Sequence, residues 1–321
     1  MARASEDDLI ATYFSPLAGQ GSLALKDDAA LLVEKPGFDT VLTCDALVAG
    51  VHFFADDPPD AIAAKALRVN LSDLAAKGAT PAGFLVALAL PRSDREWLAE
   101  FANGLRRDID DYRFPLLGGD TVATPGPLMV SVTALGHVPA GRMVPRTGAR
   151  SGDIIYVSGT IGDGALGLLA RLGTLDLCAD EESLIERYLR PQPRNALASA
   201  LLEHANAAMD LSDGLIGDLR KMMRVSGGGA QIELARVPLS PAAVAVIGRE
   251  PSCWMRALTG GDDYEILTAV APAQATAFEA AALACGVPVA RIGVATTDLD
   301  VRFRDANGAA VEFERGSFSH F

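Results

Sequence analysis

Acidic residues stand beside small residues at the edges of several apolar runs in this sequence, and one lies within such a run. They are Asp27, Asp28, Asp45, Asp73, Asp120, Asp210 and Asp213. Carboxylates without thiolate or imidazole partners suit hard cations such as Mg²⁺ or Ca²⁺. Mg²⁺ usually shares its coordination with substrate phosphates, so convergence of these acids would indicate phosphate chemistry. Asp-Gly and Gly-Asp are also ordinary turn sequences, and spacing alone does not show that the acids converge.

Asp73 lies within a helix that we predict over residues 60–78, with Asp60 as its cap and Gly78 at its end. Two apolar stripes run along this helix, so we expect most of its surface to be buried. Asp73 belongs to one stripe, where an isolated charge would be very costly. Its carboxylate must therefore be protonated, hydrogen-bonded or bound to a metal. A structural aspartate is the ordinary interpretation of one such residue, but the repetition of acids favours a functional site.

A glycine-rich turn at 158–167 follows a predicted strand and precedes a predicted helix. Such a turn can present backbone N–H groups to a phosphate. Glycines also serve simply to make a tight strand-to-helix turn, and the spacing favours neither role. No Gly-Lys-Ser/Thr sequence follows, so this is not a Walker A loop.

Composition narrows the class of protein. Half of the 321 residues are hydrophobic and the net charge is −13, which indicates a soluble globular protein and argues against nucleic acid or an anionic membrane as partner. No apolar run approaches the roughly 20 residues of a transmembrane helix. The four cysteines are scattered, which favours reduced thiols, and no signal peptide is evident. We therefore expect a cytoplasmic protein.

Predicted helices and strands alternate without a strict βαβ order, which favours an α+β fold. We expect strand-like runs at 21–33 and 84–90, and a hairpin turn at 305–308. The stretch 139–152 is rich in glycine, proline and basic residues and is typical of a connection between domains. We therefore predict domains over 1–140 and 141–321.

Six motifs together identify a known family. In chain order they are Asp-Asp-Ala-Ala-Leu-Leu at 27–32, Asp-Ala-Leu-Val-Ala-Gly-Val-His-Phe at 45–53, Asn-Leu-Ser-Asp-Leu-Ala-Ala at 70–76, Gly-Gly-Asp-Thr at 118–121, Asp-Leu-Ser-Asp-Gly at 210–214 and Gly-Gly-Asp-Asp-Tyr-Glu at 260–265. Their order and near-complete span of the chain closely resemble the thiamine-monophosphate kinase family. Its superfamily includes aminoimidazole ribonucleotide synthetase and selenophosphate synthetase.

The resemblance implies both an architecture and an activity. It implies a homodimer in which the N-terminal ATP- and metal-binding domains form a shared β-barrel, while the C-terminal α+β domain closes the nucleotide cleft. The implied reaction is Mg²⁺-assisted transfer of the γ-phosphoryl group of ATP directly to thiamine monophosphate. The product would be thiamine diphosphate, and several Mg²⁺ ions would assist. Phosphoryl transfer needs positioning and charge neutralisation more than a covalent nucleophile, which fits a set of carboxylates.

The resemblance also implies roles for individual positions, of which Asp73, Asp120 and Asp210 matter most for catalysis. The implied metal positions are Asp28, Thr43, Cys44, Asp45, Asp73, Asp120, Asp210 and Asp213. The implied nucleotide contacts are Gly119, Asp120, Arg146 and Ser212, and the implied substrate contacts are His52, Asp262 and the C-terminal aromatic Phe318.

Three positions depart from the family pattern. Ala24-Leu25-Lys26 replaces the usual Gly-x-Gly before the paired aspartates. Cys44 replaces a usual Ser or Thr, and because a soft thiol is a poor Mg²⁺ ligand, only its backbone carbonyl would serve well. Asp262 is one methylene shorter than the usual Glu. No metal-binding aspartate is lost, so we expect activity to be retained.

Two other functions remain open. One is an ATP-dependent ligase resembling aminoimidazole ribonucleotide synthetase, which would act only on formylglycinamidine ribonucleotide. The other is a non-catalytic module that senses nucleotide or metal, which steady ATP turnover with thiamine monophosphate would exclude.

Overall fold

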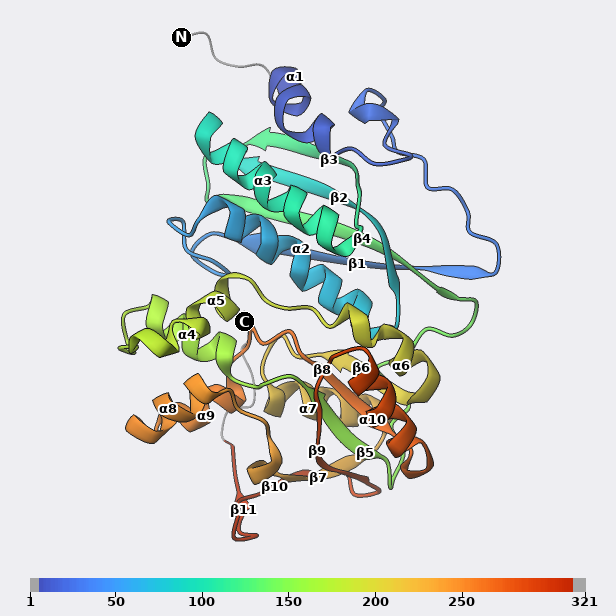
Figure 1. Ribbon diagram of the computed structural model, residues 1–321, viewed down its shortest axis with the longest axis vertical. Coiled ribbons are helices and arrows are strands. Elements are labelled where there is room, and N and C mark those ends of the chain that lie inside the picture. Colours follow the sequence, from blue (N-terminus) through green and yellow to red (C-terminus); the bar gives the residue numbers. More distant parts are fainter. Residues whose placement is uncertain (1–5, 314–321) are drawn as a thin grey trace. The chain divides into compact units, whose positions relative to one another are not determined.

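The computed structural model describes residues 6–313, which form two compact units. The first unit comprises the chain up to Leu74 together with Thr80–Gly141. The second comprises Ala75–Ala79 and the chain from Arg142 onward. Each unit mixes helices with one β-sheet (Figure 1), in agreement with the predicted mixture of helices and strands.

A four-stranded sheet forms the base of the first unit. Its strands, in spatial order, are β1 (Phe38–Val48), β4 (Met129–Pro139), β2 (Thr80–Leu90) and β3 (Leu116–Ala123). Strand β4 pairs antiparallel with β1 and with β2, whereas β2 and β3 are parallel. The run predicted as a strand at 84–90 is thus the second half of β2.

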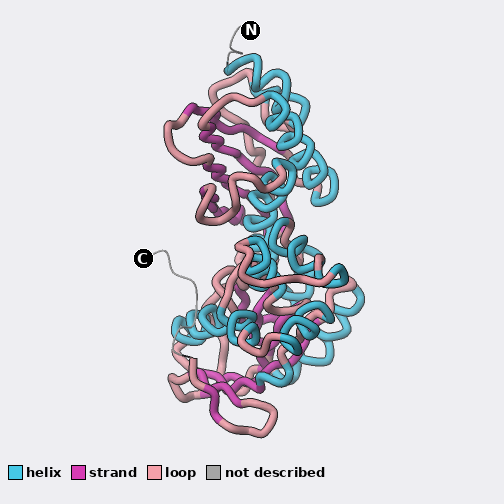
Figure 2. The backbone as a smooth tube through the Cα atoms, turned by 90° about the vertical axis from the view of Figure 1, so that its left-hand side faces the viewer, coloured by secondary structure: helices cyan, strands magenta, loops and turns pink. Residues whose placement is uncertain are grey.

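Helices α2 (Pro59–Ala76) and α3 (Arg95–Tyr112) lie on one side of this sheet, as the part of Figure 2 nearest the N-terminus shows. Leu67, Leu71 and Leu74 are fully buried, which confirms the predicted burial of this helix. Asp60 does not cap it. The helix begins one residue earlier, and the Asp60 carboxylate instead pairs with Arg107 on α3.

The other face of the sheet carries exposed apolar side chains. Leu42 is 63% exposed, Leu85 38% and Val122 48%. They come from β1, β2 and β3, so the exposed surface extends across the sheet. A sheet face of this kind is normally covered by another layer, which gives it the character of an interaction surface.

The strand expected at 21–33 does not form. Leu23–Leu25 make a short 3-10 helix, η3, in which all three residues have left-handed φ values between 52° and 58°. The following run bends at residues 27–29 and continues to Val33 without forming a strand, with one backbone bond from Leu31 N–H to the Gly21 carbonyl. The chain before it forms α1 (Glu6–Leu9) and two short helices, η1 (Ile10–Phe14) and η2 (Ser15–Leu17).

A seven-stranded, mostly antiparallel sheet organises the second unit. Its strands, in spatial order, are β11 (Ala310–Val311), β10 (Val301–Arg304), β7 (Gly229–Glu233), β9 (Val289–Thr296), β5 (Ile154–Ser158), β8 (Ile266–Val270) and β6 (Ala205–Asp210). Only the β10–β7 pair is parallel. The predicted hairpin turn at 305–308 is confirmed between β10 and β11.

Helices cover both faces of this sheet. Ile155 and Val157 of β5 pack with α7 (Leu215–Ser226), whereas Tyr156 between them packs with α6 (Ala198–His204) and α10 (Ala275–Ala284). A separate apolar cluster joins the remaining helices. These are α4 (Asp163–Arg171), α5 (Ser183–Leu189), α8 (Pro241–Arg249) and α9 (Cys253–Thr259). The described chain contains no helix long and apolar enough to cross a membrane.

We predict that Gly104→Ala destabilises the first unit by about 1–3 kcal/mol because the helices α2 and α3 approach closely there. A Cβ on Gly104 would lie 2.5 Å from the Asp60 carbonyl oxygen and 2.9 Å from the Ala63 Cβ. Gly248→Ala is the matched control, since nothing lies within 4 Å of its Cβ position in α8. We expect the control to be neutral or stabilising by up to about 1 kcal/mol. Urea unfolding measures both, and equal stability of the two variants would contradict the close contact.

Candidate active site

Asp73 and Thr43 meet between α2 and β1 in the first unit. The Thr43 hydroxyl donates to Asp73 Oδ2 over 2.5 Å. Asp73 is half-buried, although its neighbours Ser72 and Leu74 are fully buried. The free-energy cost predicted for a carboxylate in an apolar helix face is thus reduced in two ways. Asp73 is partly exposed, and its carboxylate accepts a hydrogen bond from Thr43. A carboxylate held in this way is partly accessible.

Asn70 joins α2 to β1. The sequence pattern alone does not reveal this positioning role. Asn70 is fully buried, with its Nδ2 donating to the Ala66 carbonyl over 3.0 Å. Its Oδ1 accepts the Asp45 backbone N–H over 3.1 Å. Asp45 lies two residues after Thr43 on β1, so both side chains lie on the helix-covered face. The structure therefore brings Thr43, Asp45 and Asp73 to one face of the first unit.

Cys44 lies between these residues, and its thiol points to the opposite face. Its Sγ lies 3.6 Å from the Ser131 hydroxyl and accepts a hydrogen bond from Thr133 over 3.5 Å. Both partners belong to β4, on the face that none of the helices within residues 6–313 covers. The thiol is thus directed away from Asp73, which leaves the backbone carbonyl as the group of Cys44 suited to a hard cation.

Gly119 and Asp120 lie on β3 at the far edge of the sheet. Gly119 pairs with Val86, and a Cβ added to it would lie 1.9 Å from the Val86 carbonyl oxygen, so only glycine fits. Asp120 follows in the row of Ala87, Ser131 and Ala46 on the exposed face. Within this unit Asp120 is therefore on the opposite face from Asp45 and Asp73. Asp28 is exposed in the irregular segment before β1.

His52 lies in the turn after β1, held by the end of that strand. Its Nδ1 accepts the Val48 backbone N–H over 3.0 Å, and the backbone N–H of His52 donates to the Val48 carbonyl over 2.9 Å. Since Nδ1 is an acceptor, the neutral ring carries its proton on Nε2. The donor of the half-buried neutral imidazole is thus Nε2.

Two motifs about fifty residues apart form one structure in the second unit. Leu211 N–H donates to the Glu265 carbonyl over 2.8 Å, and Tyr264 N–H donates to the Leu211 carbonyl over 2.8 Å. Asp262 N–H donates to the Ser212 carbonyl over 3.0 Å. These three bonds fix the loop of residues 260–265 against the loop of residues 210–214. The predicted positions Asp210, Ser212, Asp213 and Asp262 therefore lie on two hydrogen-bonded loops.

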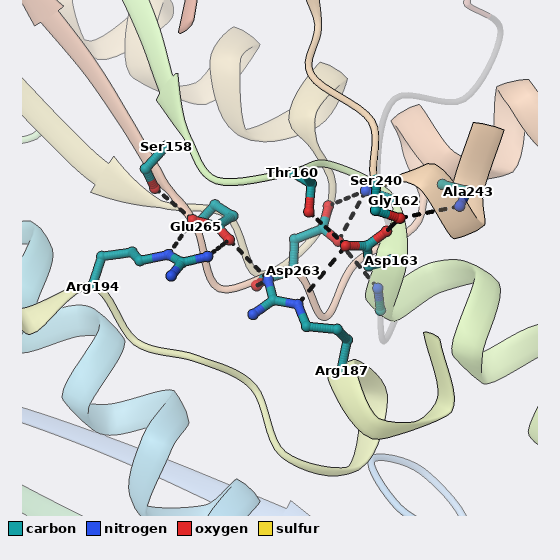
Figure 3. A network of polar contacts seen from close by, with 11 residues as sticks. Ser158, Thr160, Gly162, Asp163, Arg187, Arg194, Ser240, Ala243, Asp263 and Glu265 are labelled. Atoms are coloured by element: carbon teal, nitrogen blue, oxygen red, sulfur yellow. Dashed lines mark hydrogen bonds and ion pairs between the residues drawn. The ribbon is translucent and has the colours of Figure 1, made fainter. Parts of the chain in front are cut away.

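Glu265 anchors the end of the loop of residues 260–265 (Figure 3). Its side chain is fully buried and accepts hydrogen bonds from Ser158 over 2.6 Å and from Arg187 over 2.8 Å. Arg194 approaches the same carboxylate with Nε at 2.6 Å and with a second nitrogen. A buried carboxylate is tolerated only with such partners. The role of Glu265 is therefore to hold the loop.

Asp263 is a second buried anchor. Its carboxylate accepts the Gly162 N–H over 2.8 Å and the Gly164 N–H over 3.2 Å, at the start of α4. Burial raises the pKa of the Asp263 carboxyl well above its ordinary value, against the lowering effect of these N–H groups and of Arg187. The acid thus closes the N-terminus of α4 within the fold.

The glycine-rich turn at 158–167 is consequently part of the scaffold. Besides the two amides bound by Asp263, Gly159 N–H donates to the Pro288 carbonyl and Ile161 N–H to the Pro238 carbonyl, each over 2.9 Å. A Cβ on Gly159 would also overlap the Glu265 carboxylate at 2.1 Å. These amides are occupied within the protein, which favours the structural interpretation over the phosphate cradle.

Asp213 shares a cation with a buried neighbour. Lys221 on α7 pairs with the carboxylate of Asp213 and, over 3.0 Å, with that of Asp218. Asp218 is fully buried, and its carboxylate also accepts the Asp213 N–H over 2.9 Å. Burial raises the pKa of Asp218, while the pKa of Lys221 is raised by both acids despite the opposing effect of burial. Sequence patterns gave no sign of this cluster, although Lys221 and Asp218 are spaced for one helix face.

The other predicted positions are more scattered. Asp210 ends β6 and is buried at 6% exposure, whereas Arg146 is exposed. Phe318 lies outside the described residues 6–313. Within those residues, the group of three possible metal ligands closest together is Cys178, Asp180 and Glu181, and Arg249 already pairs with Glu181. The predicted acids are thus distributed between the two units and form no preassembled three-acid cluster in the described chain.

The donor groups themselves fit Mg²⁺. In the first unit, two carboxylates and a hydroxyl share one face, and the second unit offers Asp210 and Asp213 as further oxygen donors. Lys221 already pairs with the Asp213 carboxylate, so a metal ion at this position would have to compete with that ammonium group. Hard, oxygen-only sites of this kind favour Mg²⁺ together with ligand phosphates.

Family models match both halves of the chain. The N-terminal domain of AIR synthase related proteins matches residues 26–138, and the C-terminal domain matches residues 150–305. A thiamine-monophosphate kinase from Caulobacter vibrioides is 47% identical over 295 residues, which cover 90% of this chain and 83% of the relative. The chain belongs to the thiamine-monophosphate kinase family.

Solved structures agree with this family. The crystal structure of thiamine-monophosphate kinase from Stenotrophomonas maltophilia K279a is 40% identical, with a TM-score of 0.82 and coverage of 89% of this chain and 91% of the other. The structure of AaThiL complexed with AMPPCP and TMP is 30% identical, with a TM-score of 0.79 and coverage of 100% and 99%. The thiamine-monophosphate kinase fold therefore extends over the whole described chain.

We predict that Lys221→Met costs about 3 kcal/mol of folding free energy at pH 7, because it leaves the buried Asp218 carboxylate without its cation. Since burial raises the pKa of Asp218 above its unfolded value, the loss should shrink as pH falls toward that value. Lys221→Arg is the control and should retain most of the stability. Urea unfolding at pH 7 and pH 5 measures this, and a Lys221→Met variant as stable as the parent at pH 7 would contradict it.

Proposed function

We propose that this protein transfers the γ-phosphoryl group of ATP to thiamine monophosphate and so forms thiamine diphosphate. The observation that carries the proposal is the likeness, over the entire chain, to a relative solved with AMPPCP and TMP. AMPPCP is a non-hydrolysable stand-in for ATP, so that complex holds both reactants' binding groups. The identity of 47% to a second kinase of the family supports the same activity.

The reaction requires little covalent chemistry from the protein. An oxygen of the acceptor's phosphate forms a bond to the γ-phosphorus while the bond to the bridging oxygen breaks, and ADP leaves with that electron pair. The acceptor phosphate is already ionised at neutral pH, so no side chain has to remove a proton. The protein must instead hold two polyanions in line and offset their mutual repulsion.

Several Mg²⁺ ions would supply that charge neutralisation when bound. We assign their ligands to oxygen donors from both units. They are Asp28, Thr43, the Cys44 carbonyl, Asp45, Asp73, Asp120, Asp210 and Asp213. We assign nucleotide contacts to Gly119, Asp120, Arg146 and Ser212, and acceptor contacts to His52, Asp262 and Phe318. His52 would donate from Nε2, consistent with its Nδ1 accepting a backbone N–H.

We further propose that a second copy of the chain covers the exposed sheet face of the first unit. The exposed Leu42, Leu85 and Val122 on three strands support this, since a partner sheet would bury them and form a barrel across the dimer. Residues 1–140 would then bind nucleotide and metal and make the dimer, while residues 141–321 would close the nucleotide cleft.

Four unbridged cysteines are consistent with a cytoplasmic location.

A coupled assay of ADP release tests the activity. Purified protein with ATP and Mg²⁺ is given thiamine monophosphate, thiamine or formylglycinamidine ribonucleotide in separate reactions. We expect turnover with thiamine monophosphate and little with thiamine, because the acceptor atom is a phosphate oxygen. Turnover of thiamine while the monophosphate stays untouched would refute the proposal.

We predict that Asp73→Asn, Asp120→Asn and Asp210→Asn each lower kcat by about a hundredfold or more while the fold is retained. Each substitution removes one negative ligand but preserves the side-chain shape. Asp110→Asn, an exposed acid on α3, is the matched control and should leave turnover unchanged. The readouts are kcat at saturating Mg²⁺ and the melting temperature without metal. Near-normal turnover in all three variants would mean that the carboxylates are structural.

A further inference from the structure

The segment Gly260–Glu265 alternates between buried and accessible side chains. Asp263 and Glu265 are fully buried and bind the glycine-rich turn and two arginines, as Figure 3 shows for both anchors. Asp262, which precedes Asp263, and Tyr264, which lies between the two anchors in the sequence, are half-buried. The two anchors fix the backbone, while the side chains of Asp262 and Tyr264, which alternate with them, stay partly accessible.

Asp262 and Tyr264 are also held in an uncommon backbone conformation. Their φ values are +71° and +51°, in the left-handed region that residues with a Cβ rarely adopt. Their N–H groups bind the carbonyls of Ser212 and Leu211, so the opposite loop fixes the same two residues. Such conformations persist only where the surroundings determine them strongly, and here anchors act from both sides.

The conformation brings the two accessible side chains together. The Tyr264 hydroxyl donates to Asp262 Oδ1 over 3.3 Å. This bond is longer than the usual 2.7–2.8 Å of an O–H···O bond, and polar contacts at sites without ligand commonly shorten when the ligand binds. A phenol that donates to a carboxylate restricts its rotation and fixes the direction of its acceptor oxygens.

We propose that Tyr264 is a positioning residue that orients the Asp262 carboxylate toward the acceptor substrate. This inference rests on the proposed function, in which Asp262 contacts thiamine monophosphate. An oriented carboxylate suits the N–H donors of an aminopyrimidine and the positive charge of a thiazolium, both of which that acceptor carries. Tyr264 thus sets affinity for the acceptor and has no part in ATP binding.

The test is Tyr264→Phe, which removes the hydroxyl and keeps the ring. We expect the KM for thiamine monophosphate to rise about three- to tenfold, the usual range for one lost hydrogen bond. The KM for ATP, kcat and the melting temperature should stay unchanged. Tyr13→Phe in the first unit is the matched control and should alter none of these quantities. A purely structural role of the hydroxyl would instead lower the melting temperature and affect both substrates.

A double-mutant cycle with Asp262→Ala separates coupling from independent effects. If Tyr264 acts through Asp262, adding Tyr264→Phe to Asp262→Ala should raise the KM for thiamine monophosphate no further. Additive effects, or a Tyr264→Phe variant with parental KM values, would overturn this inference alone. A parent protein that neither binds thiamine monophosphate in calorimetry nor phosphorylates it would overturn the proposed function, and this inference with it.

Discussion

The second unit depends on one buried carboxylate, that of Glu265. Two guanidinium groups and a hydroxyl surround it, from Arg187, Arg194 and Ser158. Burial of an isolated carboxylate would cost more free energy than the net stability of a folded domain. Its hydrogen-bond and ion-pair partners must therefore be in place whenever the unit is folded. This requirement joins β5, the helix α5, the segment after it and the start of β8. The motif loop that ends at Glu265 is therefore held against the sheet that follows it.

In both units, fully buried polar residues hold the backbone while neighbouring polar residues stay partly accessible. In the first, fully buried Asn70 joins α2 to β1 and leaves Thr43, Asp45 and Asp73 together on one face. In the second, Asp263 and Glu265 are buried while Asp262 and Tyr264 remain accessible. The motifs at 70–76 and 260–265 thus each contain residues that hold the fold and residues that stay accessible. A shared motif is therefore insufficient reason to assign every polar residue in it to ligand binding.

The sequence predicted those features that depend on local pattern. The helix expected at 60–78 spans Pro59–Ala76, and the turn at 305–308 joins two paired strands. The strand expected at 21–33 is absent because an apolar run needs a hydrogen-bonded neighbour, and Leu31 and Val33 remain 60% and 67% exposed. The role of the glycine-rich turn and the pairing of Lys221 with Asp213 depend on contacts with residues outside the local pattern. Spacing placed the acids along the chain, but only the fold shows that Asp120 and Asp45 occupy opposite faces of one sheet.

Hydrogen exchange of the Glu265→Gln variant tests whether buried Glu265 fixes both motif loops of the second unit. The substitution keeps the shape but removes the charge that two arginines bind. We expect peptides covering 210–214 and 260–266 to exchange at least tenfold faster than in the parent, because the N–H groups of Leu211, Asp262 and Tyr264 lose protection. Strands β1 and β4 of the first unit should be unaffected. Unchanged exchange in both loops of a folded variant would contradict the claim.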